Sequence, residues 1–293
     1  MERITAASRL FAMLILLCGS TAMAQDSKII TDVVFASVDG KELKLDLYLP
    51  AANNAALVVY VHGGAWRAGD KGAGANVAKA LAQEGFAVAS LDFRQSTEAP
   101  FPANLHDIKA GIRFLRAKAA EYGYNAERIA ITGESSGAHL AVLAGVTNGH
   151  AELEGAVGDN LSVSSSVQTI VSYFAATDLT TILSQSTPFG VGVREPGLTL
   201  LLGELPDKKP ELAKLASPVF HIDANDPPLY ILHGDRDPQM PINQSLQLWG
   251  VYKDAGLDVI FDPVHGAPHG GPLFFTPQHQ QPVVAFLRRT LMQ

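Results

Sequence analysis

The stretch that decides the fold is RIAITGESSGAHLAVLAGV, Arg128–Val146. Its first five residues form the short apolar run of a buried strand, and the run from Gly137 onward has the composition of a helix. Gly-Glu-Ser-Ser-Gly therefore stands at a sharp strand-to-helix turn, where flanking glycines let the backbone pack closely. A solvated Gly-Ser linker would not lie between two apolar elements. The pattern predicts that Ser135 is a nucleophile held on this turn.

Short apolar runs recur along the chain, and helical patterns lie between most of them. The runs suit parallel strands covered on both faces, and they span residues 56–62, 86–93, 128–133, 168–176, 228–234 and 257–264. Helices are expected over residues 102–122, 137–148, 241–255 and 277–291. Strands alternating with helices predict an α/β fold with a mostly parallel central sheet flanked by helices.

Two segments depart from this alternation. Around Asp39 and Gly40, residues 28–37 and 41–50 alternate apolar and polar side chains, which predicts an antiparallel N-terminal hairpin. Residues 176–227 carry several prolines and glycines and only weak helical stretches. A connection of this length is usually functional. We interpret it as a cap-like helical insertion over the active site, with a purely structural insertion as the alternative.

The first 24 residues have the pattern of an export signal. Arg3 and Arg9 accompany an apolar run that is too short to span a bilayer comfortably, and Ala22-Met23-Ala24 forms a small-x-small cleavage site. We expect a mature chain of residues 25–293. It would be one domain that is periplasmic or secreted and makes no stable membrane insertion.

The composition narrows the possible chemistry. Hydrophobic residues make up 47% of the chain and charged residues 17%, which argues against disorder. The net charge of −7 lacks a basic footprint, so no nucleic-acid partner is expected. Cys18 is the only cysteine and would leave with the signal, which excludes disulfides and thiol nucleophiles. A lipoprotein anchored through Cys18 is disfavoured because Leu17 before it is large.

A serine hydroxyl needs a base, usually a histidine that a carboxylate holds. When the nucleophile stands on a strand-to-helix turn, the acid and then the histidine follow it along the chain. Asp235 and Asp237 follow one predicted strand, and His265 and His269 follow the next. Both pairs lie after strand ends, where α/β sheets place their sites. These residues alone leave both choices open.

The oxyanion of such a reaction needs backbone N–H donors. One donor comes from the residue after the nucleophile, here Ser136, and another from a glycine-rich loop after an early strand. VVYVHGGAW, Val58–Trp66, supplies that loop upstream of the serine.

With HGGAW, GESSG, YILHGDRDPQMP and the closing GAPHGG in place, the sequence resembles the α/β-hydrolases of the esterase/lipase group with an HGGxW oxyanion loop. The resemblance covers nearly the whole mature chain. It is strongest to the carbohydrate-esterase-like branch labelled bifunctional acetylxylan/feruloyl esterase.

The resemblance also chooses between the open candidates. The family pattern His-Gly-x-x-Asp-x-x-Val-Pro implies Asp237 as the acid, with Met240 in place of valine, and the pattern Gly-x-x-His-Gly implies His269 as the base. Asp235 is then a loop residue, and His265, which follows the strand directly, is expected to pack or to form a hydrogen bond. The donors it implies for the oxyanion hole are the N–H groups of Gly64, Ala65 and Ser136.

The resemblance implies a serine carboxylic-ester hydrolase (EC 3.1.1) that acts through an acyl-enzyme on short-chain or carbohydrate-linked acyl esters, without a cofactor or metal. His265 and His269 have a metal-like spacing, but they lie in a Pro- and Gly-rich loop and not on a helix, so no metal is expected. The alternatives are an arylformamidase-like amide hydrolase and a catalytically inactive binding module with the same fold.

Three features are expected to shape the substrate pocket, namely Phe189, Trp66 and the 176–227 insertion. Packing into the core is an equal alternative for Trp66. The sequence favours no particular acyl group or oligomeric state.

Overall fold

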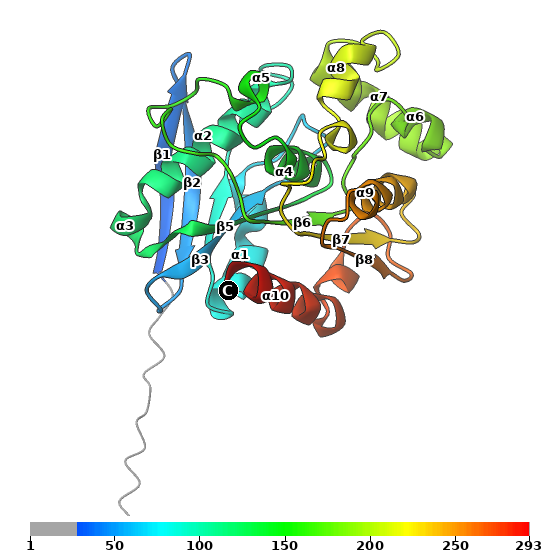
Figure 1. The fold of residues 1–293 in the computed structure, drawn as a ribbon. Coiled ribbons are helices and arrows are strands. Elements are labelled where there is room, and N and C mark those ends of the chain that lie inside the picture. The colour runs from blue at the N-terminus through cyan, green and yellow to red at the C-terminus, as the bar shows by residue number, and fades with distance from the viewer. Residues whose placement is uncertain (1–27, 293) are drawn as a thin grey trace, which may run out of the picture.

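The computed structural model describes residues 28–292, so the predicted export signal at 1–24 lies outside the described residues. The described chain is built on one eight-stranded sheet of order β1-β2-β4-β3-β5-β6-β7-β8 (Figure 1). Its strands are β1 (Lys28–Val38), β2 (Lys41–Leu49), β3 (Ala55–Val61), β4 (Ala87–Leu91), β5 (Tyr124–Glu134), β6 (Thr169–Tyr173), β7 (Leu229–Gly234) and β8 (Val259–Val264).

The strand directions confirm the sequence-based expectation. β1 pairs with β2, and β2 with β4, in antiparallel fashion, while all pairs from β4 through β8 are parallel. The sheet is therefore mostly parallel with an antiparallel N-terminal hairpin. Because parallel strands need crossovers, the chain passes over a face of the sheet between them, mostly as a helix.

Helices cover both faces of the sheet (Figure 1). One face carries α1 (Ala75–Gln83) and α10 (Pro277–Leu291), and the other carries α2 (Ala103–Ala117), α4 (Ser136–Val146) and α9 (Asn243–Asp254). Successive side chains of β3 alternate between the two layers: Val59 joins the core under α2 and α4, and Val58 joins the core under α1 and α10. Burial on both faces explains why such strands are continuous apolar runs in the sequence.

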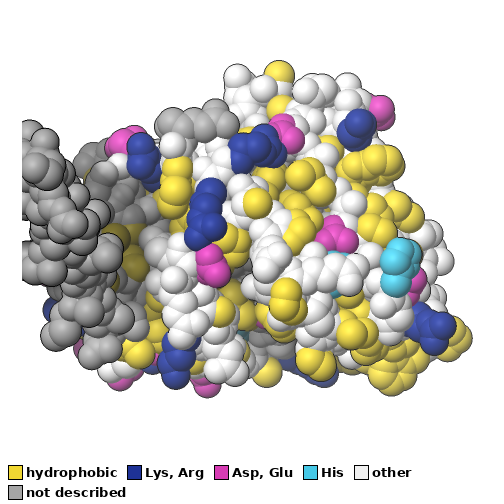
Figure 2. Space-filling view, turned by 90° about the horizontal axis from the view of Figure 1, so that it is seen from below, with side chains coloured by type: hydrophobic (Ala, Val, Ile, Leu, Met, Phe, Trp, Pro, Cys, Tyr) yellow, Lys and Arg dark blue, Asp and Glu magenta, His cyan; other side chains and the backbone are white. Residues whose placement is uncertain are grey.

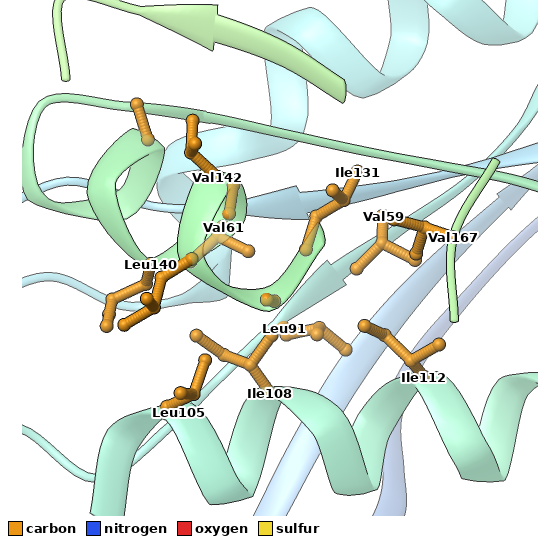
Figure 3. Packing of buried hydrophobic residues seen from close by; sticks show 14 of the residues in the cluster. Val59, Val61, Leu91, Leu105, Ile108, Ile112, Ile131, Leu140, Val142 and Val167 are labelled. Atoms are coloured by element: carbon orange, nitrogen blue, oxygen red, sulfur yellow. The ribbon is translucent and has the colours of Figure 1, made fainter. Parts of the chain in front are cut away.

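The core under α2 is built from the regularly spaced apolar residues of this helix. Leu105, Ile108 and Ile112 are three and four residues apart, so they form one stripe on α2 that faces the sheet (Figure 3). Leu91 and Ile131 from the strands meet this stripe, and all five side chains are fully buried. Burying side chains of this kind contributes about 1.5–3 kcal/mol each.

α4 is buried on every side. All of its residues from Ser136 to Val146 are buried, because the sheet lies on one side of it and outer segments on the other. This position accounts for the absence of a polar face in GAHLAVLAGV.

The remaining elements are short, except one. They are η1 (Lys71–Gly74), α3 (Ala119–Tyr122), α5 (Ala151–Glu154), α6 (Ile182–Gln185), α7 (Pro188–Leu202), α8 (Pro210–Leu215), η2 (Pro218–Phe220) and η3 (Pro272–Phe275). Helices α6, α7 and α8 belong to the 176–227 insertion and gather at one end of the molecule (Figure 1). α7 is longer than its weak helical pattern predicts, because Pro196 and three glycines lower its intrinsic propensity while buried Leu198 and Leu201 hold it in place.

Two element predictions were wrong in detail. The helix expected over 102–122 is interrupted at Lys118, which leaves the helical conformation, and α3 then ends at Gly123 with φ +83°. β8 was expected to be covered on both faces, yet five of its six residues are partly or fully exposed. β8 is an edge strand that pairs only with β7, and an edge position also tolerates Pro263.

The close approach of α4 to β3 predicts a steep cost for any side chain at Gly137. A Cβ there would lie 2.3 Å from the carbonyl oxygens of both Val61 and His62. We expect Gly137→Ala to lower the free energy of unfolding by roughly 1–3 kcal/mol, because the backbone must shift.

The matched control is Gly250 in the middle of α9, where an added Cβ would meet nothing within 4 Å. There, alanine should raise the free energy of unfolding by roughly 0.5–1 kcal/mol through helix propensity. Urea titration measures both values. Equal effects of the two substitutions would contradict the close-packing account.

Candidate active site

The register of the sheet brings the predicted site loops to one edge. Val61 at the end of β3 pairs with Gly133 of β5, and Glu134 pairs with Tyr173 at the end of β6. Gly234 at the end of β7 pairs with the last residue of β8. The loops that leave these strands start side by side, which is where open α/β sheets bind ligands.

Ser135 stands on a sharp turn between β5 and α4. Its backbone has φ +55° and ψ −121°, a conformation that non-glycine residues rarely adopt. The Ser135 N–H donates to the carbonyl of Tyr173 at 2.9 Å, and α4 begins at the next residue. The turn is therefore fixed from both sides, and strain of this kind is typical of functional positions.

The structure brings the three predicted catalytic side chains together. His269 Nε2 lies 2.9 Å from Ser135 Oγ, and His269 Nδ1 lies 2.6 Å from Asp237 Oδ2. A carboxylate only accepts, so Nδ1–H donates to Asp237 and Nε2 is left to accept the Ser135 hydroxyl proton. The arrangement forms a continuous chain of hydrogen bonds from the serine hydroxyl through the imidazole to the buried carboxylate.

Asp237 is held in the ionised form. Its Oδ1 accepts from the N–H groups of Gln239 and Met240, each at 2.8 Å. Burial raises the pKa of Asp237, but hydrogen bonds from His233 and His269 outweigh it and bring the pKa below its usual range. Its side chain is fully buried, so these partners replace water completely.

The two rejected candidates pair with each other. His265 Nδ1 lies 2.9 Å from Asp235 Oδ2, and the Gly266 N–H also donates to Asp235. The His265 side chain is 82% exposed. Within residues 28–292 neither Asp235 nor His265 makes a hydrogen bond to Ser135 or His269, so the geometry separates an inner pair from an outer one.

The predicted oxyanion donors border the same cavity as Ser135. Within the described part of the chain, the N–H groups of Gly64, Ala65 and Ser136 make no hydrogen bond, so they are free to donate to a ligand. Gly64 has φ +126°, and a Cβ there would lie 1.9 Å from the Ala68 carbonyl oxygen. Only glycine fits that position. Ser136 opens α4, whose N-terminal dipole favours negative charge.

His62 supports this loop from below. It is almost fully buried, its ring stacks on Phe93 at 4.4 Å between centroids, and its Nδ1 lies 2.8 Å from the Gly63 carbonyl oxygen. Burial lowers the pKa of His62. The ring has no contact with Ser135 among the described hydrogen bonds, so it holds the loop rather than the reacting atoms.

Trp66 both packs and lines the cavity, so the two alternatives for it are compatible. Its Nε1–H donates to His139 Nδ1 at 2.9 Å, which leaves the His139 Nε2–H to donate to the Ala216 carbonyl at 2.6 Å. Burial lowers the pKa of His139 to about 4, so the ring is neutral at pH 7. One chain of hydrogen bonds thus joins the loop after β3, α4 and the 176–227 insertion. Sequence reasoning missed His139, whose only signal was a polar residue inside an apolar helix.

The cavity at Ser135 has a volume of about 480 Å³. The insertion contributes Val193 and Arg194 from α7, and the ring of Phe174 lies edge-on to His269 at 4.7 Å between centroids. Phe189 does not line the cavity and is 60% exposed, so its predicted role in the pocket was wrong. α7 turns a different face toward the site than the one that carries Phe189.

A second hollow adjoins the first. It has a volume of about 810 Å³, lies between α1 and α10, and shares Ala73 and Glu134 with the cavity at Ser135. Figure 2 looks onto the side of the molecule that carries these two helices, where hydrophobic and charged side chains are interspersed. Tyr60 donates to Glu134 at 2.9 Å, and burial raises the pKa of Glu134. No sequence motif had singled out Glu134, the first of the two variable residues of Gly-x-Ser-x-Gly.

Two further observations concern the described residues alone. Among residues 28–292, no three His, Cys, Asp or Glu side chains gather so that they could hold a metal ion. None of the described helices combines the length and apolar character needed to cross a membrane.

Known proteins resemble this chain in sequence and in fold. Residues 45–251 match the BD-FAE family. Esterase LipQ of Mycobacterium tuberculosis is 30% identical over 223 residues, which are 74% of this chain and 51% of LipQ. The chain thus spans about half the length of this curated relative.

Solved structures match the fold over most of the chain. A truncated carbohydrate esterase from gut microbiota superposes with a TM-score of 0.84 at 34% identity, covering 93% of this chain and 99% of that one. A bifunctional GH43-CE protein of Bacteroides eggerthii superposes with a TM-score of 0.82 at 36% identity. The match covers 90% of this chain and 35% of that one. With the sheet order above, these matches confirm the α/β-hydrolase fold.

The burial of His139 predicts a pH-dependent stability. Its pKa is about 4 in the folded chain and about 6.5 when unfolded. Between about pH 6.5 and pH 4, His139 is protonated in the unfolded state and largely neutral in the folded state. The free energy of unfolding should therefore fall between about pH 6.5 and pH 4, by up to about 1.4 kcal/mol per pH unit from this group.

Urea unfolding from pH 4.5 to 8 measures this dependence. His139→Asn should flatten the fall while lowering stability at pH 8, because the buried hydrogen bonds are broken. His265→Asn removes an exposed histidine and should leave the contribution of His139 in place. An unchanged pH profile in His139→Asn would refute the assignment.

Proposed function

This chain belongs to the BD-FAE family, and on that basis we propose that it is a serine hydrolase of carboxylic esters that works through an acyl-enzyme. The observation that carries the proposal is the connected arrangement of Ser135, His269 and Asp237, with contacts of 2.9 and 2.6 Å. The esterase LipQ and the solved carbohydrate esterase support the reaction class.

In the proposed reaction Ser135 Oγ attacks the ester carbonyl while His269 Nε2 takes the hydroxyl proton. His269 then delivers that proton to the leaving alcohol, and the acyl group remains on the serine. A water molecule attacks the acyl-enzyme in the second half-reaction, again with His269 as the base. Asp237 orients the ring and stabilises its charged form, for which its low pKa is suited.

The developing oxyanion needs donors that are already in place. The N–H groups of Gly64, Ala65 and Ser136 are proposed to receive it, and the dipole of α4 adds to their effect. The chain of hydrogen bonds from Trp66 through His139 holds the loop and α4 in a constant relation, so little reorganisation is needed during the reaction.

The proposed substrates are short-chain or carbohydrate-linked acyl esters. A cavity of about 480 Å³ suits a small acyl group, and the hollow between α1 and α10 is open to a larger alcohol. Two solved relatives are named as a carbohydrate esterase and as a GH43-CE protein. An arylformamidase-like amide hydrolase would use the same three side chains, and an inactive binding module would not need them.

The two adjacent serines give the first test of the proposal. Ser135→Ala should lower kcat/KM for p-nitrophenyl acetate by roughly 10⁴-fold or more, because the nucleophile is gone. Ser136→Ala should keep most activity, because only its backbone N–H is needed. Circular dichroism checks that both variants fold. Similar activities in the two variants would show that the turn has been misread.

The two aspartates give a second test, with a matched control in the same loop. Asp237→Asn should lower kcat by roughly 10⁴-fold, because an amide in that position favours the wrong tautomer of His269. Asp235→Asn should stay close to the wild type, since Asp235 pairs only with exposed groups. Steady-state kinetics on p-nitrophenyl acetate compares them, and a larger loss in Asp235→Asn would overturn the choice of acid.

A further inference from the structure

One face of α7 lies across both loops of the proposed site. Gly190, Arg194 and Gly197 are four and three residues apart, so they share that face. A Cβ on Gly190 would lie 2.8 Å from the Gln239 carbonyl oxygen, and a Cβ on Gly197 would lie 3.1 Å from the Ala65 carbonyl oxygen. The glycines let α7 touch two loops. One is the loop after β7 that carries Asp237 and Gln239, called the acid loop, and the other is the loop after β3 that carries Ala65, called the oxyanion loop. Arg194 projects between these two contacts.

Arg194 lines the cavity at Ser135 yet is only 3% exposed. Its Nη1 donates to the Gly190 carbonyl at 3.4 Å, which is a long and weak contact. Its Nε is buried without a hydrogen-bond partner, and within residues 28–292 no salt bridge to Arg194 is formed. Buried Arg113 also has an unpartnered Nε, but its two terminal nitrogens donate to two carbonyls and to the Glu154 carboxylate.

A buried guanidinium with unused donors is costly. Desolvation of a charge is repaid only when hydrogen bonds and opposite charge replace the water. Burial lowers the pKa of Arg194 to about 10, while the charge of Asp237 opposes the shift, so the group is still charged at pH 7. The cost of burying Arg194 is offset if a bound ligand supplies the hydrogen-bond acceptor that the protein lacks there.

Asp237 is not that partner. Its oxygens already accept from two backbone N–H groups and from His269, with His233 at 3.4 Å, and no hydrogen bond joins it to Arg194. The two groups interact through space only. Arg194 therefore contributes a positive potential to the cavity and keeps its donors for another acceptor.

We propose that Arg194 binds a carboxylate carried by the ester substrate, so that the protein prefers esters with a free acid group. This inference rests on the proposed function, because it places the ligand in the same cavity. The planar fork of a guanidinium matches a carboxylate with two parallel hydrogen bonds.

The positions of Arg194 and Glu134 in the cavity orient the ligand. Glu134 also lines it, accepts from Tyr60 and borders the hollow between α1 and α10, which Arg194 does not border. A substrate carboxylate is attracted by Arg194, and Glu134 offers it no positive charge. The acid group therefore points toward α7, and uncharged parts of the substrate point toward the hollow.

The kinetic test compares charged esters with neutral ones of the same shape. Mono-4-nitrophenyl glutarate carries the acid on the acyl side, and its methyl ester is the neutral match. 4-Acetoxybenzoate carries the acid on the alcohol side, and methyl 4-acetoxybenzoate is its match. In at least one pair, Arg194→Met should lower the ratio of kcat/KM for the charged ester to that for the neutral ester by roughly 10–100-fold. The pair that responds identifies which side of the ester faces Arg194.

Two variants control this result. Arg236→Met removes an exposed positive charge from the acid loop and should leave the ratio unchanged, which excludes a general effect of charge. Arg194→Lys keeps the charge without the fork and should lie between wild type and Arg194→Met. The midpoint of thermal unfolding should rise in Arg194→Met, because an unpaired buried charge is removed. A purely structural arginine would instead lower it.

A binding measurement keeps this inference separate from the proposed reaction. Titration calorimetry with monomethyl glutarate and dimethyl glutarate compares Ser135→Ala with the double variant Ser135→Ala/Arg194→Met. The monoacid should bind the single variant roughly 10–100-fold more tightly than the double variant, while the diester shows no such difference.

The outcomes are distinct. Neutral esters that are not hydrolysed by the wild type would refute the proposed function, and the titration would still test Arg194. Unchanged charged-to-neutral ratios in both ester pairs, or equal monoacid affinities in the two titrated variants, would overturn the role of Arg194.

Discussion

The structure depends on the close approach of two backbones at the turn that carries Ser135. α4 leaves β5 directly against the end of β3, so close that a Cβ on Gly137 would meet two carbonyl oxygens at 2.3 Å. This contact places the first residue of α4 beside the loop after β3 and goes with the φ of +55° at Ser135. The surrounding core must hold that strain, and it does so with a helix that is buried on every side.

The site is assembled from segments that are far apart in the chain but adjacent in the sheet. Parallel strands end at the same edge, so the loops after β3, β5, β7 and β8 meet there without long excursions. Helix α7 of the 176–227 insertion then borders the cavity through Val193 and Arg194. α7 rests on the acid loop through Gly190 and on the oxyanion loop through Gly197, which joins the two halves of the site through one rigid helix.

Two buried charged side chains, Asp237 and Arg194, differ in how many hydrogen-bond partners the protein gives them. Asp237 has its lone pairs filled by backbone and histidine donors, and its pKa is low. Arg194 has one weak contact and a lowered pKa. The first arrangement is complete in the free protein. The second is completed by the proposed ligand, and a stability cost of this kind is expected where a site is built for binding.

The order of elements, the hairpin, the mostly parallel sheet and the candidates for each site position could all be read from the chain, because hydrophobic period and glycine placement are local properties. The choice of Asp237 over Asp235 and of His269 over His265 needed a family resemblance, since each pair follows the same strand and has the same chemistry. In the structure, Asp237 and His269 are the members of each pair that connect to Ser135.

The tertiary structure alone places Trp66 against His139, Arg194 over the cavity and Phe189 in solvent. These positions depend on how helices pack against segments that are distant in the sequence. Trp66 and His139, for example, are 73 positions apart, and no local pattern encodes such a contact.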